Sequence, residues 1–118
     1  MSDRVKSLFS QEVITSNNDW TTIATLAIPQ NGTGKIHGRI FAQSSGSVRA
    51  EFDQVFSGER GTGAVTLLLD ALDVISPRKD VSALLWDTRG QANGGNLEIQ
   101  VKGAVSDDVA WWAYGDTW

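Results

Sequence analysis

The sequence has no cysteine, a single histidine and only two prolines in 118 residues. Without cysteine there are no disulfide bonds and no thiolate metal sites, so the stability of the fold does not depend on a redox compartment. A chain of this length buries about two thirds of the surface that its unfolded form exposes. We therefore expect one folded domain that needs neither a covalent cross-link nor a cofactor.

The sequence also lacks any run of basic residues and any long apolar stretch. Its formal charge is −4, whereas a nucleic-acid groove requires a clustered positive field. No segment approaches the roughly 20 apolar residues that span a bilayer. The segment from Met1 to Ser10 has charges but no continuous apolar stretch, so it is not a secretory signal. We expect no nucleic-acid or membrane partner, and synthesis in the cytoplasm without signal-directed secretion.

Residues suited to catalysis are few. The single histidine, His37, lies in a predicted strand beside Arg39, where a packed or surface role is the simpler interpretation. Ser44 and its neighbouring serines flank Gly46 and are explained as turn residues, and there is no Gly-x-Ser-x-Gly elbow. Two acidic pairs lack the spacing of a calcium-binding loop: Asp70 with Asp73, and Asp107 with Asp108. We expect no catalytic, cofactor-binding or metal-binding residues and no enzymatic activity.

What the chain does contain is a series of short alternating segments separated by Gly, Asn and Ser clusters. The alternation predicts strands at 20–28, 35–45, 48–56, 65–69, 81–88, 96–103 and 107–114, and another near 10–16. Segment 57–63 is predicted to be a turn, 89–95 another, and 70–80 a connection with room for one helical turn, because Pro77 disfavours helix at the preceding residue. This pattern predicts an all-β protein, an antiparallel sandwich or jelly roll of about eight strands. We place an extended N-terminal arm at 1–12 and a single sandwich domain at 13–118.

The faces of two strands can be assigned from the alternation. In 96–103 the apolar residues Leu97, Ile99 and Val101 are predicted to point inward, and the polar residues between them outward. In 35–45 the inward set is Ile36, Gly38, Ile40 and Ala42, while Lys35, His37, Arg39 and Phe41 share the other face.

The last strand has no polar face, because Trp111 and Trp112 are adjacent within it. Successive side chains of a strand point to opposite faces, so only one of the two indoles can enter the core. Trp111 shares its face with apolar residues only and is predicted to be buried. Trp112 and Tyr114 then form an outward aromatic patch, of the kind enriched at protein interfaces. A loop or the N-terminal arm of the same chain is an alternative cover for that patch. The other two strand tryptophans, Trp20 and Trp86, are predicted to fill the core.

Several of these segments together resemble a known domain. They are Trp20 before a Thr/Ile strand, 34–42, 48–52, and the ending 97–111 with its alternating strand, Gly-Ala turn and Trp-bearing strand. The set resembles a small β-sandwich domain of tailed-bacteriophage structural proteins, including capsid decoration proteins and the terminal domains of tail fibres and appendages. The resemblance covers about 20–113 and leaves out the first nineteen residues and the last few. Since it takes in most of the chain, it favours a decoration protein over a fibre.

The resemblance implies a virion structural protein that decorates the outer capsid surface and stabilises the head. Its expected partners are copies of itself, as a trimer, and the major capsid protein. Trp112, Tyr114 and Trp118 are the candidate interface residues, and Val5, Leu8 and Phe9 would form an arm that docks on the capsid. The alternative is a tail fibre or receptor-binding module that stacks a host-surface carbohydrate on Trp112 and Tyr114, with polar groups near Trp118 orienting its hydroxyls.

Overall fold

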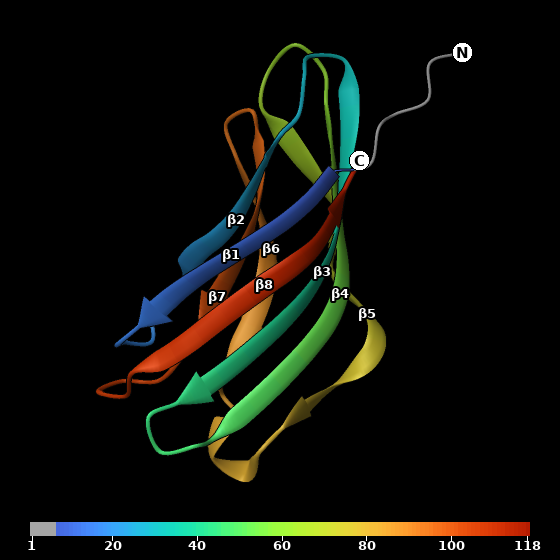
Figure 1. Cartoon of the computed structure of the whole chain (residues 1–118). Helices are drawn as coiled ribbons and strands as arrows, with labels where there is room; N and C mark the ends of the chain where they lie inside the picture. The colour runs from blue at the N-terminus through green and yellow to red at the C-terminus, as the bar shows by residue number, and fades with distance from the viewer. Residues whose placement is uncertain (1–6) are drawn as a thin grey trace.

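The computed structural model describes residues 7–118 as an all-β sandwich (Figure 1), which confirms the predicted fold class. Eight strands and one short helical turn follow one another along these described residues. They are β1 (Ser7–Thr15), β2 (Thr21–Ala27), β3 (Gly32–Ser44), β4 (Arg49–Arg60), β5 (Val65–Lys79), the 3-10 turn η1 (Val81–Ala83), β6 (Asp87–Asn93), β7 (Asn96–Lys102) and β8 (Val109–Thr117).

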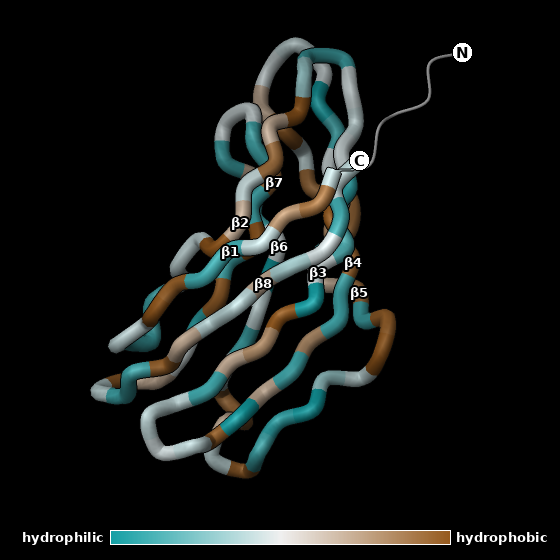
Figure 2. Tube along the Cα trace, viewed as in Figure 1, coloured by the Kyte–Doolittle hydropathy of each residue, from teal (hydrophilic) through white to brown (hydrophobic). Residues whose placement is uncertain are grey.

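The strands form two antiparallel sheets. One has five strands in the order β1-β8-β3-β4-β5, and the other has three in the order β2-β7-β6. The molecule is elongated along the strands, with extents of 49 × 23 × 20 Å. Apolar and polar residues follow one another along β3 and β4 (Figure 2), because each of these strands has one face on the core and one on the surface.

The predicted inward faces are confirmed. Leu97, Ile99 and Val101 of β7 are fully buried, as are Ile36 and Ile40 of β3. One outward residue of β7 is nevertheless shielded from solvent. Glu98 is buried, because three side chains donate hydrogen bonds to its carboxylate: Thr22 Oγ1 (3.0 Å), Asn93 Nδ2 (3.1 Å) and Gln100 Nε2 (3.2 Å).

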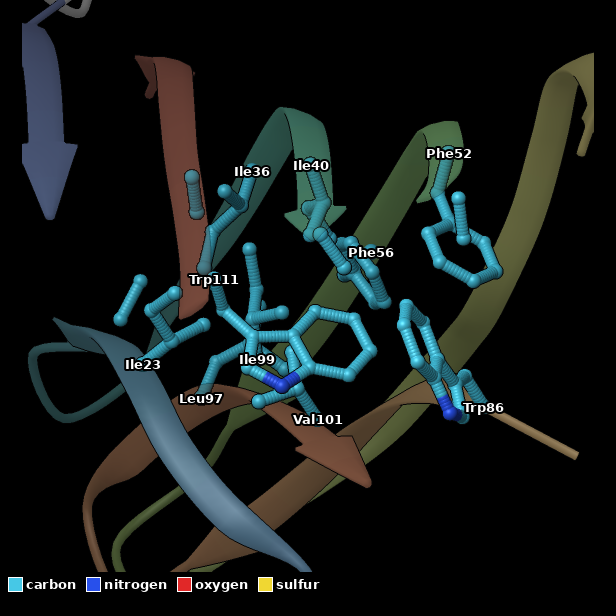
Figure 3. Packing of buried hydrophobic residues seen from close by; sticks show 14 of the residues in the cluster. Ile23, Ile36, Ile40, Phe52, Phe56, Trp86, Leu97, Ile99, Val101 and Trp111 are labelled. Carbon is cyan, nitrogen blue, oxygen red and sulfur yellow. The ribbon is translucent and has the colours of Figure 1, made fainter. Parts of the chain in front are cut away.

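Two tryptophans occupy the centre of the core (Figure 3). The rings of Trp111 and Trp86 lie 6.1 Å apart between centroids, and Phe52 stacks on Trp111 at 6.2 Å. The Trp111 indole Nε1–H donates to the buried Thr15 Oγ1 at 3.0 Å. This bond satisfies the polar atom of Trp111, so its whole ring can be removed from water without an unpaired donor.

Trp20 is not part of the core, so its predicted role was wrong. It is partly exposed and lies under the Arg89 guanidinium, 4.4 Å from the ring centroid, and the Lys102 ammonium, 4.9 Å away. Both cations extend from strands of the three-stranded sheet, β6 and β7. The ring is therefore held at the surface by cation–π contacts rather than by burial.

The segment 70–95 differs most from the prediction. β5 continues to Lys79 through several register shifts and a positive φ at Ala71, and the helical turn comes after it, at Val81–Ala83. In the predicted strand at 81–88, residues 81–86 are this turn and a loop, and only Asp87 and Thr88 belong to β6. β6 continues through 89–93 of the predicted turn, and the turn itself is confined to 94–95. The reason is Gly90, which is a packing glycine. A Cβ there would lie 3.0 Å from the Phe56 ring, and its N–H donates to Asp70 Oδ1 at 2.5 Å.

The N-terminal segment is in part a strand. Residues 7–12, placed in the arm by the sequence prediction, pair with β8 from Ser7 opposite Thr117 to Glu12 opposite Trp112. The remaining arm residues, 1–6, lie outside the described residues. β1 is therefore an edge strand of the five-stranded sheet, next to the strand that carries the tandem tryptophans.

Candidate functional site

The two adjacent tryptophans of β8 point to opposite faces, as the strand period requires. Trp111 is 0% exposed and Trp112 is 40% exposed, which confirms the predicted orientation. Tyr114, two residues on, is 39% exposed on the same outer face. The Trp112 side chain therefore lies on the outer surface of the five-stranded sheet.

A third aromatic residue joins them from the neighbouring strand. Phe41 of β3 lies directly opposite Trp112 in the register, and its ring stacks on Tyr114 with centroids 5.9 Å apart and planes within 7°. Phe41 is 36% exposed. We call Phe41, Trp112 and Tyr114 the aromatic face. The sequence prediction placed Phe41 on the outward side of its strand without assigning it a role. The signal for a surface site was an aromatic residue on the same strand face as Lys35, His37 and Arg39.

Charged residues surround the aromatic face. Glu12 lies opposite Trp112 on β1, and Glu51 lies opposite Phe41 on β4. On the next row Arg39 lies opposite both Tyr114 and Asp53. An apolar centre with a charged border is the usual composition of a protein–protein interface.

His37, Arg39 and Asp53 form a charged cluster beside this face. The His37 Nε2–H donates to Asp53 Oδ1 at 2.5 Å, and the Arg39 Nε lies 3.8 Å from Asp53 Oδ2. Arg39 is the most exposed of the three, with 55% of its side chain accessible. Its guanidinium is therefore the accessible cation on this side of the aromatic face.

A groove of about 470 Å³ runs along the outer face between β1, β8 and β3. We call it the β1–β8 groove. It is lined by Leu8, Phe9, Ser10, His37, Arg39, Tyr114, Gly115 and Asp116. Its floor depends on Gly115, since a Cβ at this position would lie 1.9 Å from the His37 carbonyl oxygen. Only glycine allows β8 and β3 to approach this closely.

Two smaller depressions lie around the aromatic face. One of about 220 Å³ places Phe41 near Ile75 of β5, with Arg39, Glu51 and Arg78 at its border. The other, of about 340 Å³, places Trp112 near Ile14 and Ala110. The outer face of the five-stranded sheet is therefore uneven, with apolar residues in the depressions beside its aromatic centre and charged residues at their border.

The structure separates the three residues predicted to form the capsid-docking arm. Leu8 is on the outer face and 83% exposed, in the β1–β8 groove. Phe9 packs against the core, with its ring tip 3.9 Å from the place of a Cβ on Gly38. Phe9 therefore contributes to the domain's own packing, and Val5 lies outside the described residues.

Trp118 is not part of the aromatic face. Its backbone exchanges two hydrogen bonds with Lys35, and the Lys35 ammonium lies 5.6 Å from its ring centroid. Its ring lines a separate depression together with Leu26 and Pro29. Of the three predicted interface residues, the structure brings together Trp112 and Tyr114 only.

A second apolar surface was missed by sequence reasoning. Around η1 the side chains of Val81, Leu84 and Leu85 are 85%, 62% and 84% exposed. We call these three residues the apolar tip. On β5, Leu72, Val74 and Ile75 are also exposed. The signal in the sequence was the run Val81-Ser82-Ala83-Leu84-Leu85, too apolar for a surface loop.

The loop that carries the apolar tip is anchored by buried neighbours and by hydrogen bonds. Ala83 and Trp86, which flank its leucines, are buried. Lys79 Nζ donates to the carbonyl oxygens of Leu84 (3.4 Å) and Trp86 (2.7 Å), and Arg49 N–H donates to Asp80 Oδ2 at 2.8 Å. The tip therefore presents three aliphatic side chains on a loop whose backbone is hydrogen-bonded to the rest of the domain.

Polar residues elsewhere have structural partners. Ser44 is the last residue of β3, and its Oγ accepts the N–H groups of Gly46 (3.1 Å) and Val48 (3.2 Å), so it stabilises the turn that follows. Within residues 7–118, no group of three or more His, Asp and Glu side chains is placed to hold a metal ion. In the same residues, no helix is long and apolar enough to cross a membrane.

Comparison with known proteins finds no family model, no curated protein and no solved structure that matches this chain. The resemblance to phage sandwich domains therefore stays an expectation from the sequence.

Proposed function

We propose that this protein is a non-enzymatic structural subunit that associates with copies of itself through the aromatic face. In its most specific form, the proposal is a capsid decoration protein of a tailed bacteriophage, a trimer on the outer capsid surface that contacts the major capsid protein and stabilises the head. The observation that carries the proposal is the stack of Phe41 on Tyr114 beside Trp112, three accessible aromatic rings on one sheet face.

The size of the aromatic face fits the centre of an interface. Aromatic side chains bury about 150–250 Å² each, and these three are 36–40% exposed. They would therefore supply about 170–290 Å² of ring surface, against about 800 Å² per partner in a standard interface. The depressions on either side and the charged border extend the contact, so the aromatic residues act as its anchoring centre.

The capsid assignment is supported by the sequence resemblance. Repeated contacts between sandwich subunits and neighbouring capsomers would raise the barrier to their separation, which is the physical task of a decoration protein. Leu8, which the proposal places against the capsid, is exposed. Phe9 is not, because its ring is packed on its own core.

The second candidate is a carbohydrate-binding or receptor-binding module. The observation that favours it is the β1–β8 groove beside the Tyr114 ring, in which His37, Arg39 and Asp116 supply polar groups near an aromatic wall. Its volume of about 470 Å³ falls in the range of about 300–1,000 Å³ typical of ligand sites. Under this alternative the aromatic face stays open in the assembled particle.

The deciding experiment mixes purified protein with expanded phage heads and with host-surface glycans. The proposal expects saturable binding to heads at a fixed number of copies per capsomer, and a self-associated mass in solution by light scattering. Binding to glycans without binding to heads would establish the second candidate instead. A strict monomer that binds neither would contradict both.

A further inference from the structure

The first strand, β1, is an open edge of the five-stranded sheet (Figure 1). It pairs with β8 over its whole length without a register shift, and within residues 7–118 no strand pairs with its other side. β1 contains no proline, and Glu12 is its only charged residue. An edge strand that is regular, nearly uncharged and unpaired is a template for pairing with another strand.

The remaining sheet edges are interrupted or covered. β5 has several register shifts and contains Pro77, and β2 has a register shift between Thr22 and Ala24. At the edge of β6, the Gly90 N–H already donates to Asp70 Oδ1 of β5 at 2.5 Å. Among the described strands, β1 is therefore the edge that most readily accepts a partner.

The residues of β1 that can bond to a partner follow from the register. Trp118 and Lys35 exchange two backbone hydrogen bonds, so the even-numbered residues of β8 bond to β3 and the odd-numbered ones to β1. The odd-numbered residues of β8 lie opposite the odd-numbered residues of β1. The even-numbered residues of β1 therefore direct both their N–H and their C=O to the open side: Leu8, Ser10, Glu12 and Ile14.

We propose that β1 of one copy pairs antiparallel with β1 of a second copy, across a two-fold axis at Gln11. The two five-stranded sheets then form one continuous sheet. In this register β1 is complementary to itself, because apolar residues lie opposite apolar ones and polar residues opposite polar ones. The pairs are Ser7 with Thr15, Leu8 with Ile14, Phe9 with Val13, and Ser10 with Glu12.

The neighbouring registers lack this match. The axis has to pass through a residue, since otherwise outward residues of one copy would lie opposite inward residues of the other. With the axis at Ser10, Leu8 would lie opposite Glu12. With the axis at Glu12, the two Glu12 carboxylates would lie opposite each other, which is destabilising. The sequence of β1 therefore favours the axis at Gln11.

Apolar side chains on both faces of β1 gain partners in the pair. On the outer face, Leu8 is 83% exposed and Ile14 is 69% exposed, and each contacts the flank of the other across the axis. This lateral contact leaves the outward surface of Leu8 available to the capsid. On the inner face, Phe9 and Val13 already pack against the core, so their contact continues the core of one copy toward that of the next.

The aromatic face lies beside this contact and is separate from it. Its residues are on β3 and β8, with Trp112 opposite Glu12 and Tyr114 opposite Ser10 in the β1–β8 register. The pair therefore places the aromatic faces of two copies on the same outer surface, one on either side of the joined β1 strands, and leaves both accessible. The β1 contact does not rest on association through the aromatic face, and one copy can use both.

The test introduces a single cysteine into a chain that has none. Gln11 is exposed and lies opposite its own copy in a pair without hydrogen bonds. The Cα atoms of such a pair are about 4.5 Å apart, which is within the range that a disulfide spans. Under mild oxidation Gln11→Cys is therefore expected to shift from the monomer mass to the mass of a disulfide-linked dimer, measured by mass spectrometry without reductant.

Ser7→Cys is the matched control, because Ser7 is exposed on the same strand. In the proposed register it lies roughly 26 Å along the strands from its own copy, so it is expected to keep the monomer mass. Adding Ser10→Pro to Gln11→Cys removes an outward N–H that the pair needs, and it is expected to abolish the cross-link. Adding Ser10→Ala keeps that N–H and the cross-link. Circular dichroism of each variant checks that the sandwich is intact.

The outcomes separate this inference from the proposed function. If Gln11→Cys cross-links no faster than Ser7→Cys, or if Ser10→Pro leaves the cross-link unchanged, pairing of copies at β1 is wrong and the edge is left for a strand of another protein. That result leaves the aromatic-face association standing. Adding Trp112→Ala to Gln11→Cys is expected to keep the cross-link, and its loss would contradict a separate β1 contact. A retained cross-link together with an oligomer mass that Trp112→Ala does not lower would support the β1 pair and contradict association through the aromatic face.

Discussion

The rings of Phe41 and Tyr114 lie parallel, 5.9 Å apart, on the outer face of the five-stranded sheet. The pairing of β3 with β8 brings them together in a diagonal position, because Phe41 is opposite Trp112 in the register. An aromatic pair of this geometry contributes about 0.5–1.5 kcal/mol beyond its buried area. The face on which partners are proposed to bind is therefore ordered before they arrive.

The two adjacent tryptophans should respond oppositely to truncation. Trp112→Ala is expected to dissociate the oligomer with little change in thermal stability, because its ring faces outward. Trp111→Ala is expected to lower the free energy of unfolding by about 3–5 kcal/mol, because it empties the core. Light scattering and denaturant unfolding measure the two effects. Unfolding caused by Trp112→Ala would mean that this residue belongs to the core.

Gly115 should not tolerate a side chain. Gly115→Ala places a methyl group 1.9 Å from the His37 carbonyl oxygen, so β8 and β3 must separate locally, at a cost of about 1–3 kcal/mol or more. Gly61→Ala is the matched control, since no described atom lies within 4 Å of its new Cβ. Thermal unfolding of both variants tests the difference. Equal stability would contradict the close approach of the two strands.

The hydrogen bond between Trp111 and Thr15 can be tested by a change of similar shape. Thr15→Val removes the hydroxyl that accepts the indole N–H at 3.0 Å, and an unpaired buried donor costs about 1–3 kcal/mol. Thr25→Val, at an exposed position of β2, should change stability little. Denaturant midpoints of the two variants give the comparison, and a neutral Thr15→Val would show that the indole has another partner.

Trp20 and Trp86 also predict different outcomes. Trp86→Ala should cost about 3–5 kcal/mol, because the ring is buried beside Trp111. Trp20→Ala should cost much less, since contacts with exposed cations contribute about 0.5–1 kcal/mol each. Unfolding curves followed by far-UV circular dichroism report both values. A large loss for Trp20→Ala would restore the core role that the sequence predicted.

The sequence by itself determined the fold class and the inward faces of its regular strands. β7 alternates apolar and polar residues in its sequence, and β3 alternates buried and more exposed positions from Gly34 to Ser44. Burial of one face is enough to specify which residues point inward. The opposite orientations of Trp111 and Trp112 follow from the same period, which depends only on the local backbone.

Only the tertiary structure decided what depends on contacts between distant segments. Gly90 was predicted as a turn residue, but it is a strand residue because Phe56 packs against it. Trp20 was predicted in the core, but Arg89 and Lys102 hold it at the surface. The partner of Tyr114 in the aromatic face, Phe41, is set by the pairing of β3 with β8. The period of a strand is set by neighbouring residues, whereas register and packing bring together residues that are far apart in the chain. The candidate site depends on register and packing, so only the tertiary structure could reveal it.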